Sequence, residues 1–421
     1  MEDRKSQKID DFDLIFKEYC ANIDGYLSPE TEAVYSNIFG NYLAALEKAS
    51  EHRKSMGSKE SLHLPDSFLI PQIIDQIKNE LESGRLSGQE KISSEVALEL
   101  LERPLNPIEF LDGSQCFSAK EYIVQAARNY HYTLINEAHY SSQHRKFTTT
   151  LLQPLWDIGY RYLALEALSS KDTDLVERGY PLKTSGYYIN DPTFGEMLRK
   201  ALKIGYKVIA YDSSIGTDEN LRDSTQAERI YAQTYAKDHL GKVLVHAGYG
   251  HIWETGDSHY SPMGAKLKGI FGMDILTIDQ EQMTPYLEGK LSHPYWLSAN
   301  KIFNFERPIV LVDSAGNSVL SSTCLGSIDI QVYHPGTVFI NGRPNWLIDS
   351  CHRFYTVPNE LQKYTGKLLK IVSDNESIDA VPVDQIVIGS LEKLLVEPGE
   401  YVAHLVDCNG ILISSYPIVF N

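Results

Sequence analysis

Four short apolar runs near the middle of the chain each end on an acidic residue or a histidine, and no other feature constrains the fold as strongly. They occupy residues 133–139, 162–166, 208–212 and 243–246. The last three runs follow a glycine and a basic residue. A helix that ends at glycine and leads into a buried strand is the repeating unit of a parallel sheet flanked by helices. The pattern therefore predicts an α/β fold.

The polar ends of these runs locate a candidate site. Parallel sheets bind ligands outside the carboxyl ends of their strands, and the residues at those ends are Glu137, His139, Glu166, Asp212 and His246. Asp212 begins a polar loop, where a helix-cap or turn role explains it as well as a functional one. We expect the other four residues to form a site at one edge of the sheet.

Three regions follow from changes of pattern along the chain. Residues 1–115 show the three-and-four spacing of amphipathic helices and predict a helical N-terminal region that could cover the strand ends. Residues 116–292 alternate helical and strand patterns and predict a parallel-sheet core with flanking helices. Residues 293–421 carry short β-rich runs between turns and predict a β-rich, sandwich-like domain.

Local signals place further elements in the core. Asp191 followed by Pro192 marks the start of a helix, and Gly205 marks its end. Pro154 lies inside another helical pattern, which it should kink or shorten. Further helices are expected over residues 222–239 and 263–272, and a fifth parallel strand over residues 273–279.

Composition argues against several classes of protein. The chain has 421 residues and a net charge of −17, which repels polyanions, so we do not expect nucleic acid as a partner. Its five cysteines are scattered and never form a CxxC pair, so neither a zinc ribbon nor a disulfide framework is indicated. The GxSxG, GxxxxGK[ST], HExxH and GxGxxG motifs of common enzyme classes are absent.

The first residues of the sequence bear on the cellular location of the protein. The first residues are charged and no apolar segment follows them, so no signal peptide is predicted. No apolar run approaches the length that spans a bilayer. These features predict a cytoplasmic protein without a membrane span, although a chain that had lost an export signal would look the same.

The segment after the first core strand combines four chemically useful residues. Glu137 and His139 are two positions apart, so their side chains point to the same side where the strand ends. A carboxylate beside an imidazole can bind a metal, or it can orient a general base. His144 and Arg145 open the next helix, where a cation and an imidazole favour an anionic group or a developing oxyanion.

A second pair of histidines follows a later strand. Two glycines separate His246 from His251, and the tight turn they permit can bring both imidazoles to the same edge of the sheet. Glu166 ends an apolar strand, where a buried carboxylate needs a metal, a histidine or Arg145 as partner. Arg222 lies at the start of the next helix and is a candidate substrate ligand.

Part of the chain, about residues 120–280, resembles a known superfamily. The matching segments are Glu137-Ala-His139 with His144-Arg145, Gly159-Tyr-Arg-Tyr-Leu-Ala-Leu-Glu166, Arg222-Asp223 with Ala227 and Glu228, and Gly248-Tyr-Gly-His251. Together they resemble the superfamily that joins erythromycin esterases, TraB/TIKI proteins and ChaN-type haem-binding proteins. Asn136 stands where these relatives usually have glycine, and the Glu-x-His spacing is that of the ChaN type.

The resemblance implies a hydrolase that acts on an ester or peptide bond of a small molecule or peptide. His139 would be the general base, with Glu137 and Glu166 orienting it and His251 completing the site. In the TIKI-like version a divalent metal (Mn, Co or Zn) is implied, with ligands from His139, His246, His251 and Glu166. The esterase-like version needs none. Arg145, with His144 and Arg222, would bind the substrate or stabilise an oxyanion.

Two other functions are compatible with the same residues. The ChaN-type resemblance implies a haem-binding or metal-binding protein in which the histidines ligate iron or a free metal without turnover. Tyr140, Tyr249 and Trp253 could supply the apolar face that haem requires. A scaffold whose β-rich tail does the binding is a third alternative, although the retention of all four histidines and both strand-end glutamates argues against it.

Overall fold

The structure is a computed structural model that describes residues 27–56, 111, 113–212, 218–256, 260–321, 324, 326–389 and 393–421. Its largest sheet is formed by β1 (Gln115–Ser118), β2 (Tyr132–Glu137), β3 (Tyr160–Leu165), β4 (Lys207–Ala210), β5 (Lys242–Gly248), β6 (Leu276–Asp279), β7 (Ile309–Val312) and β8 (Ile330–Tyr333). These eight strands lie in the order β1-β7-β8-β6-β2-β5-β3-β4.

The centre of this sheet is parallel. β5 lies between β2 and β3, β6 pairs with the other side of β2, and β4 pairs with the other side of β3. β7 runs antiparallel to both of its neighbours. All six residues of β2 are buried, as a nearly continuous apolar strand requires when helices cover both faces of a sheet. The expected α/β fold with at least five parallel strands is confirmed.

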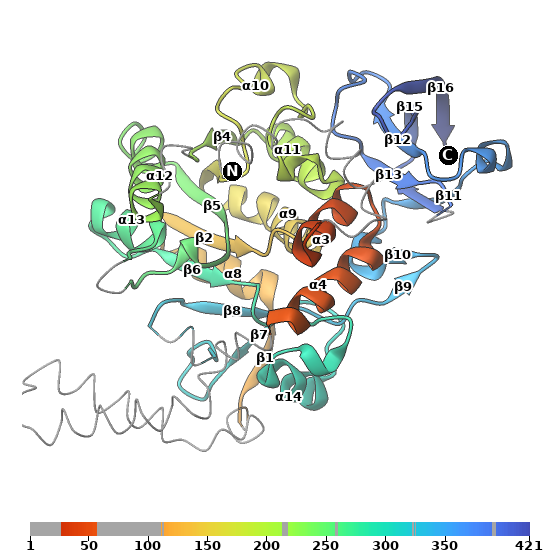
Figure 1. The fold of residues 1–421 in the computed structure, drawn as a ribbon. Helices are drawn as coiled ribbons and strands as arrows, with labels where there is room; N and C mark the ends of the chain where they lie inside the picture. The colour runs from red at the N-terminus through yellow and green to blue at the C-terminus, as the bar shows by residue number, and fades with distance from the viewer. Residues whose placement is uncertain are drawn as a thin grey trace, which may run out of the picture.

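Helices cover both faces of the sheet (Figure 1). They are α8 (Ala119–Ala127), α9 (Ser142–Asp157), α10 (Leu175–Arg178), α11 (Pro192–Ile204), α12 (Glu219–Gln233), α13 (Met263–Phe271) and α14 (Pro294–Phe303), with 3₁₀ turns η3 (Tyr188–Asn190), η4 (Tyr249–Ile252), η5 (Gly289–Leu291), η6 (Asn345–Leu347) and η7 (Asn359–Tyr364). Apolar residues of α8, α9 and α11 share one buried cluster, and those of α12 and α13 share another. Each cluster packs against the sheet.

The helix signals of the sequence correspond to observed ends. Asp191 accepts a hydrogen bond from the Thr193 N–H, Pro192 is the first residue of α11, and Gly205 ends that helix with a φ of +113°. Pro154 lies within α9 without ending it, and the helix continues to Asp157. Because Pro154 is in the last turn, the helix loses only one N–H donor there.

The large sheet continues past residue 293, where the sequence pattern suggested that the core ends. The run Ile309–Val312 was expected in the β-rich domain, but it forms β7 of the large sheet, and Ile330–Tyr333 forms β8 beside it. All residues of both strands are buried. β8 pairs with the edge of β6, which would otherwise expose unpaired backbone groups.

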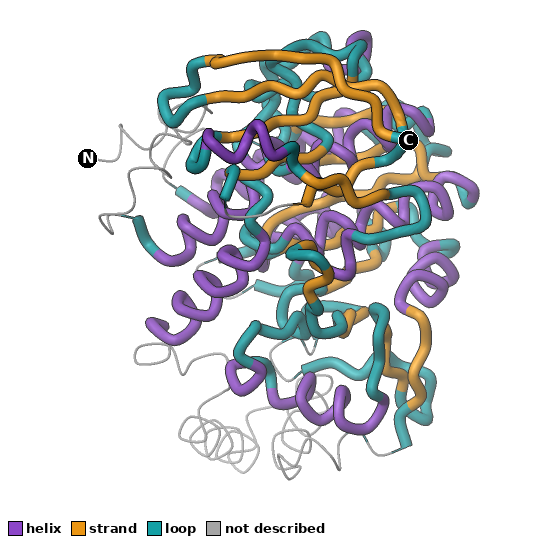
Figure 2. Tube along the Cα trace, turned by 90° about the vertical axis from the view of Figure 1, so that its right-hand side faces the viewer, coloured by secondary structure: helices purple, strands orange, loops and turns teal. Residues whose placement is uncertain are grey.

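The C-terminal region is β-rich, as expected. Its strands are β9 (Phe339–Ile340), β10 (Arg343–Pro344), β11 (Arg353–Thr356), β12 (Leu368–Ser373), β13 (Asp384–Val387), β14 (Lys393–Val396), β15 (Gly399–Val406) and β16 (Leu412–Phe420). Four of them form an antiparallel sheet in the order β13-β12-β15-β16, which lies at the top of the view in Figure 2. It has an apolar cluster of its own.

Two N-terminal helices, α3 (Pro29–Ile38) and α4 (Tyr42–Met56), lie between the core and the C-terminal sheet (Figure 1). Val34, Tyr35 and Ile38 of α3 share an apolar cluster with Leu368 and Val406 of the C-terminal sheet. The remainder of the predicted helical region 1–115, apart from its last few residues, lies outside the described residues. Among the described helices, none combines the length and the apolar character needed to cross a bilayer.

Candidate functional site

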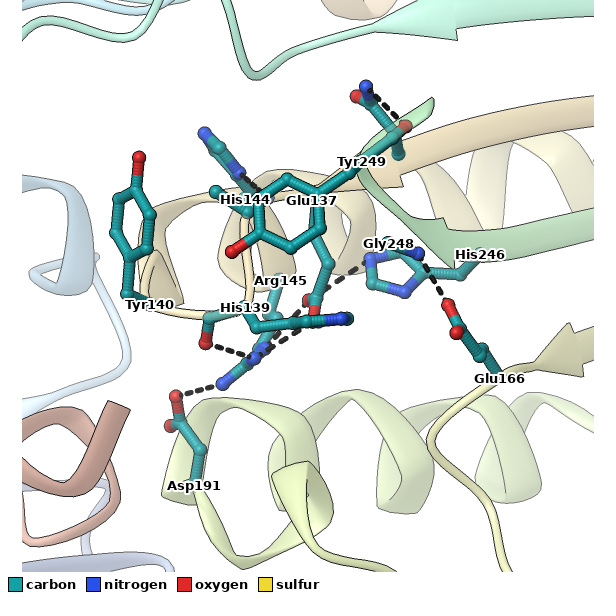
Figure 3. Close-up of polar contacts among 12 residues, drawn as sticks. Glu137, His139, Tyr140, His144, Arg145, Glu166, Asp191, His246, Gly248 and Tyr249 are labelled. Atoms are coloured by element: carbon teal, nitrogen blue, oxygen red, sulfur yellow. Dashed lines mark hydrogen bonds and ion pairs between the residues drawn. The ribbon is translucent and has the colours of Figure 1, made fainter. Parts of the chain in front are cut away.

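The carboxyl ends of β2, β5 and β3 meet at one edge of the sheet (Figure 3). Glu137 of β2 pairs in register with Gly248 of β5, and Leu165 of β3 pairs with His246. Glu166 directly follows β3. The topology therefore brings Glu137, His246 and Glu166 to the same level, although they are far apart in the sequence.

Glu137 and Arg145 form a buried ion pair that also includes Asp191. Arg145 donates from Nε to Glu137 Oε2 (2.7 Å), from Nη2 to Glu137 Oε1 (2.8 Å) and from Nη1 to Asp191 Oδ2 (2.6 Å). All three side chains are at most 2% exposed. Burial alone would raise the pKa of Glu137, but the charge and hydrogen bonds of Arg145 hold that pKa well below its usual value. Glu137 is therefore ionised.

His139 is fixed by contacts on several sides of its ring. Its Nδ1 lies 3.0 Å from Glu137 Oε1, and because an ionised carboxylate only accepts hydrogen bonds, Nδ1 carries the proton. The ring stacks on Tyr188 with 4.0 Å between centroids and meets Tyr249 edge-on at 4.9 Å. The side chain is 16% exposed. This arrangement leaves the lone pair of Nε2 as the available base.

Gly248 lies directly against the ring of His139. A β-carbon at this position would be 2.4 Å from His139 Cε1 and 2.6 Å from Nε2, far inside van der Waals contact. The same point is 3.3 Å from Glu166 Oε2. Glycine is therefore required here for steric reasons, and the two functional side chains border one small space.

We expect Gly248→Ala to displace His139 from Glu137. The crowding should cost about 1–3 kcal/mol in the free energy of unfolding. Gly250→Ala is the matched control, because its β-carbon would meet Trp253 at an ordinary 3.6 Å. Urea unfolding of both variants checks this. Equal behaviour of the two variants would contradict the proposed contact.

His251 forms a second pair of imidazole and carboxylate. Its Nδ1 donates to Asp223 Oδ2 (3.0 Å). The same oxygen accepts hydrogen bonds from the Tyr260 hydroxyl (2.6 Å) and the Met263 N–H (2.9 Å). Burial alone would lower the pKa of His251, but the hydrogen bond that its Nδ1 donates to Asp223 and the charges of Glu166 and Asp223 raise that pKa above its usual value. The protonated imidazole is thus favoured.

Glu166 lies close to both histidine pairs. Its Oε2 accepts the Gly248 N–H (2.6 Å), its Oε1 accepts a hydrogen bond from Arg222 Nη2 (2.7 Å), and the same Oε1 lies 3.8 Å from His251 Nε2. The partner of this carboxylate is therefore Arg222 rather than Arg145. Arg222 also donates from Nε to Asp212 Oδ1 (3.0 Å), so Asp212 holds this arginine in place.

The other predicted site residues occupy supporting positions. His144 is 1% exposed, accepts the Ala138 N–H at Nδ1 (3.0 Å) and contacts Thr284 through Nε2 (2.8 Å). Burial lowers the pKa of His144 well below its usual value and lowers the pKa of His246 to about 4, so both are neutral. Since His144 and Arg145 are buried and engaged, their position favours support of Glu137 and the nearby backbone over substrate contact.

Sequence reasoning missed the roles of three residues of this site. Asp223 was noted as part of a resembling helix but not as the partner of His251, and Asp191 was expected only to cap α11. Tyr188, whose ring covers His139, also gave no signal. Each of these contacts joins segments distant in the sequence, which no local pattern predicts. Glu228 is exposed, as a solvated helix face predicts.

The four expected metal ligands do not converge. Among the described residues, no group of three His, Cys, Asp or Glu side chains has a geometry that could hold a metal ion. His139 uses Nδ1 for Glu137, His251 uses Nδ1 for Asp223, and His246 Nε2 lies 3.6 Å from Glu137 with no hydrogen-bond partner in the described part of the chain.

Comparisons with known proteins add little. No family model and no curated protein matches the chain. Similar solved structures include the type III effector HopBA1, with 18% identity over 39% of this chain and 82% of that one and a TM-score of 0.31. Another, described as bacterial protein toxins, has 12% identity over 61% of this chain and 47% of that one and a TM-score of 0.29.

A third similar structure is RRSP, a MARTX toxin effector domain from Vibrio vulnificus CMCP6, with 17% identity and a TM-score of 0.27. The match covers 56% of this chain and 45% of that one, so the chain spans less than half of RRSP and of the previous structure. TM-scores this low establish neither a shared fold nor a shared function. The resemblance to the erythromycin esterase, TraB/TIKI and ChaN superfamily stays a prediction.

Proposed function

We propose that this protein is a hydrolase that cleaves an ester or peptide bond by histidine acid–base chemistry. One observation carries the proposal. Two imidazoles are each oriented through Nδ1 by a buried carboxylate, His139 by Glu137 and His251 by Asp223. His139 lies against Gly248, whose N–H is bound by Glu166, and His251 lies 3.8 Å from Glu166 itself. One imidazole presents a free lone pair and the other favours the protonated form, which is the division of roles that general acid–base catalysis requires.

The proposed reaction assigns one proton transfer to each histidine. His139 Nε2 takes a proton from a water molecule while the water oxygen attacks the carbonyl carbon. The tetrahedral intermediate then breaks its bond to the leaving oxygen or nitrogen, and that atom takes a proton from His251 Nε2. Glu137 stabilises the imidazolium of His139, as an ionised carboxylate at Nδ1 does. Exchange with solvent returns both histidines to their starting states.

The surrounding charges have distinct proposed roles. Glu166 accepts the Gly248 N–H, and its charge helps to raise the pKa of His251. Arg222 is 30% exposed and uses Nε and Nη2 for Asp212 and Glu166, so its remaining edge is suited to an anionic substrate group or an oxyanion. Arg145 acts indirectly, because its burial limits it to holding Glu137 ionised and in place.

A panel of esters and peptides, assayed with matched variants, tests the proposal. We expect His139→Gln and His251→Gln to lower any hydrolysis of the panel by about 10²–10⁴-fold, the usual contribution of a positioned acid or base. His352→Gln is the control. His352 also forms an imidazole–carboxylate pair, with Asp349 at 2.7 Å, but it lies in the C-terminal region. Wild-type rates in both site variants would refute the proposal.

A further inference from the structure

Helix α3 contacts the same aromatic residues that hold His139. Glu30 accepts a hydrogen bond from the Tyr249 hydroxyl (2.9 Å), and the ring of Tyr249 packs edge-on against His139. Tyr188, which stacks on His139, belongs with Tyr140 to the apolar cluster centred on α3. The N-terminal helix therefore covers the side of the site that the tyrosines form.

The turn between α3 and α4 is firmly attached to the C-terminal sheet. Gln385 Nε2 donates to the Ile38 carbonyl (2.5 Å), and Arg343, paired with the buried Asp384, donates to the Gly40 carbonyl (3.3 Å). A β-carbon on Gly40 would lie 2.0 Å from the Gln385 carbonyl oxygen, and the φ of Gly40 is +72°. Close backbone packing and a buried ion pair thus fix this end of the hairpin.

At the opposite, open end of the hairpin, polar side-chain contacts with the core supplement the apolar packing of Leu27 and Tyr35. At the start of α3 the contact is Glu30 with Tyr249, and at the end of α4 it is an ion pair between Lys54 and Glu288. The Lys54 and Glu288 side chains are 46% and 38% exposed, and exposed ion pairs contribute little to stability. Tyr249 also has a φ of +45°, which is unfavourable for a residue with a side chain.

We propose that the α3–α4 hairpin is a hinged cover over the histidine site, fixed at residues 38–42 and latched by the Tyr249–Glu30 hydrogen bond. Breaking this latch frees the start of α3 while the turn stays on the C-terminal sheet, which opens His139 to solvent and to large substrates. The claim that the cover regulates substrate entry rests on the proposed hydrolase function. The claim that the cover limits access to His139 does not rest on it, and this access can be measured without any substrate.

Chemical modification of His139 by diethyl pyrocarbonate, followed by mass spectrometry of the full chain, tests the cover. The reagent acylates unprotonated imidazole nitrogen, and Nε2 of His139 is the available atom. Glu30→Ala removes the latch. Glu32→Ala is the matched control, because Glu32 is also acidic in the first turn of α3 but pairs with Lys48 of α4 instead of the core. His352, 13% exposed and in the C-terminal region, is the internal reference.

We expect Glu30→Ala to raise the modification rate of His139 about tenfold, the factor typical for loss of a hydrogen bond to a charged group. Glu32→Ala and the rate at His352 should stay within about twofold of wild type. Unchanged modification of His139 in Glu30→Ala, or an equal rise at His352, would overturn the hinged cover. If His139 becomes accessible as expected while the ester and peptide panel shows no turnover, the cover stands and the hydrolase proposal fails.

Discussion

Arg145→Met should lower the free energy of unfolding by about 3–5 kcal/mol, because removing one partner of a buried ion pair leaves its counter-ions uncompensated. Arg145 is the shared partner of Glu137 and Asp191, and all three side chains are buried. The loss is a large fraction of the stability of a typical domain. Urea unfolding at neutral pH measures it.

A control and a rescue make this result specific. Arg161→Met should cost less than about 1 kcal/mol, because the Arg161 guanidinium donates to the Trp156 and Tyr160 carbonyls, lies over the Trp156 ring and forms no ion pair with the described residues. Adding Glu137→Gln and Asp191→Asn to Arg145→Met should recover part of the loss, since the buried charges are then gone. If Arg145→Met were as stable as Arg161→Met, the buried ion pair would not hold this edge of the sheet together.

The second large effect is loss of stability in mild acid. His246 and His334 are buried, and burial lowers the pKa of His246 to about 4 and that of His334 to about 3. Between these values and the usual 6.5 of the unfolded chain, the unfolded state binds protons that the folded state does not. Stability therefore falls as the pH drops through this window, by about 1.4 kcal/mol per pH unit for each such histidine.

Urea unfolding at a series of pH values between about 6.5 and 4.5 measures the slope. The raised pKa of His251 acts in the opposite direction, since it contributes stability below the unfolded value that is lost as the pH rises through the folded one. His334→Asn should reduce the dependence of the unfolding free energy on pH by about 1.4 kcal/mol per pH unit, the contribution of one histidine. An acid slope in His334→Asn equal to that of the wild-type protein would show that this imidazole is not buried in the neutral form.

The ends of β2 and β3 could be predicted from sequence because the signals are local, whereas β5 continues two residues past its expected end at His246, to Gly248. A glycine that ends a helix and an apolar run that follows it lie within a few residues of each other, and Glu137 and His139 share one extended segment. These short-range rules also predicted the cap at Asp191 and the end of α11 at Gly205. Where geometry is set by adjacent residues, the sequence was sufficient.

The partners of these residues could not be predicted, because they come from distant segments. Arg145 was expected to face a substrate but contacts Asp191, and Glu166 is paired with Arg222 across 56 positions. The run Ile309–Val312 shows the same limit. A buried apolar strand of four residues carries no signal for the sheet that it joins, and the β-rich surroundings suggested the wrong one.

The division of roles between His139 and His251 is the central claim, and nitrogen NMR of the full chain with ¹⁵N-labelled histidine tests it most directly. Assignments come from His139→Gln and His251→Gln. The predicted result is that neutral His139 carries its proton on Nδ1 and that His251 titrates above the usual value of 6.5, with Asp223→Asn shifting that midpoint downward. A proton on Nε2 of neutral His139, or a His251 midpoint below 6.5, would contradict the account.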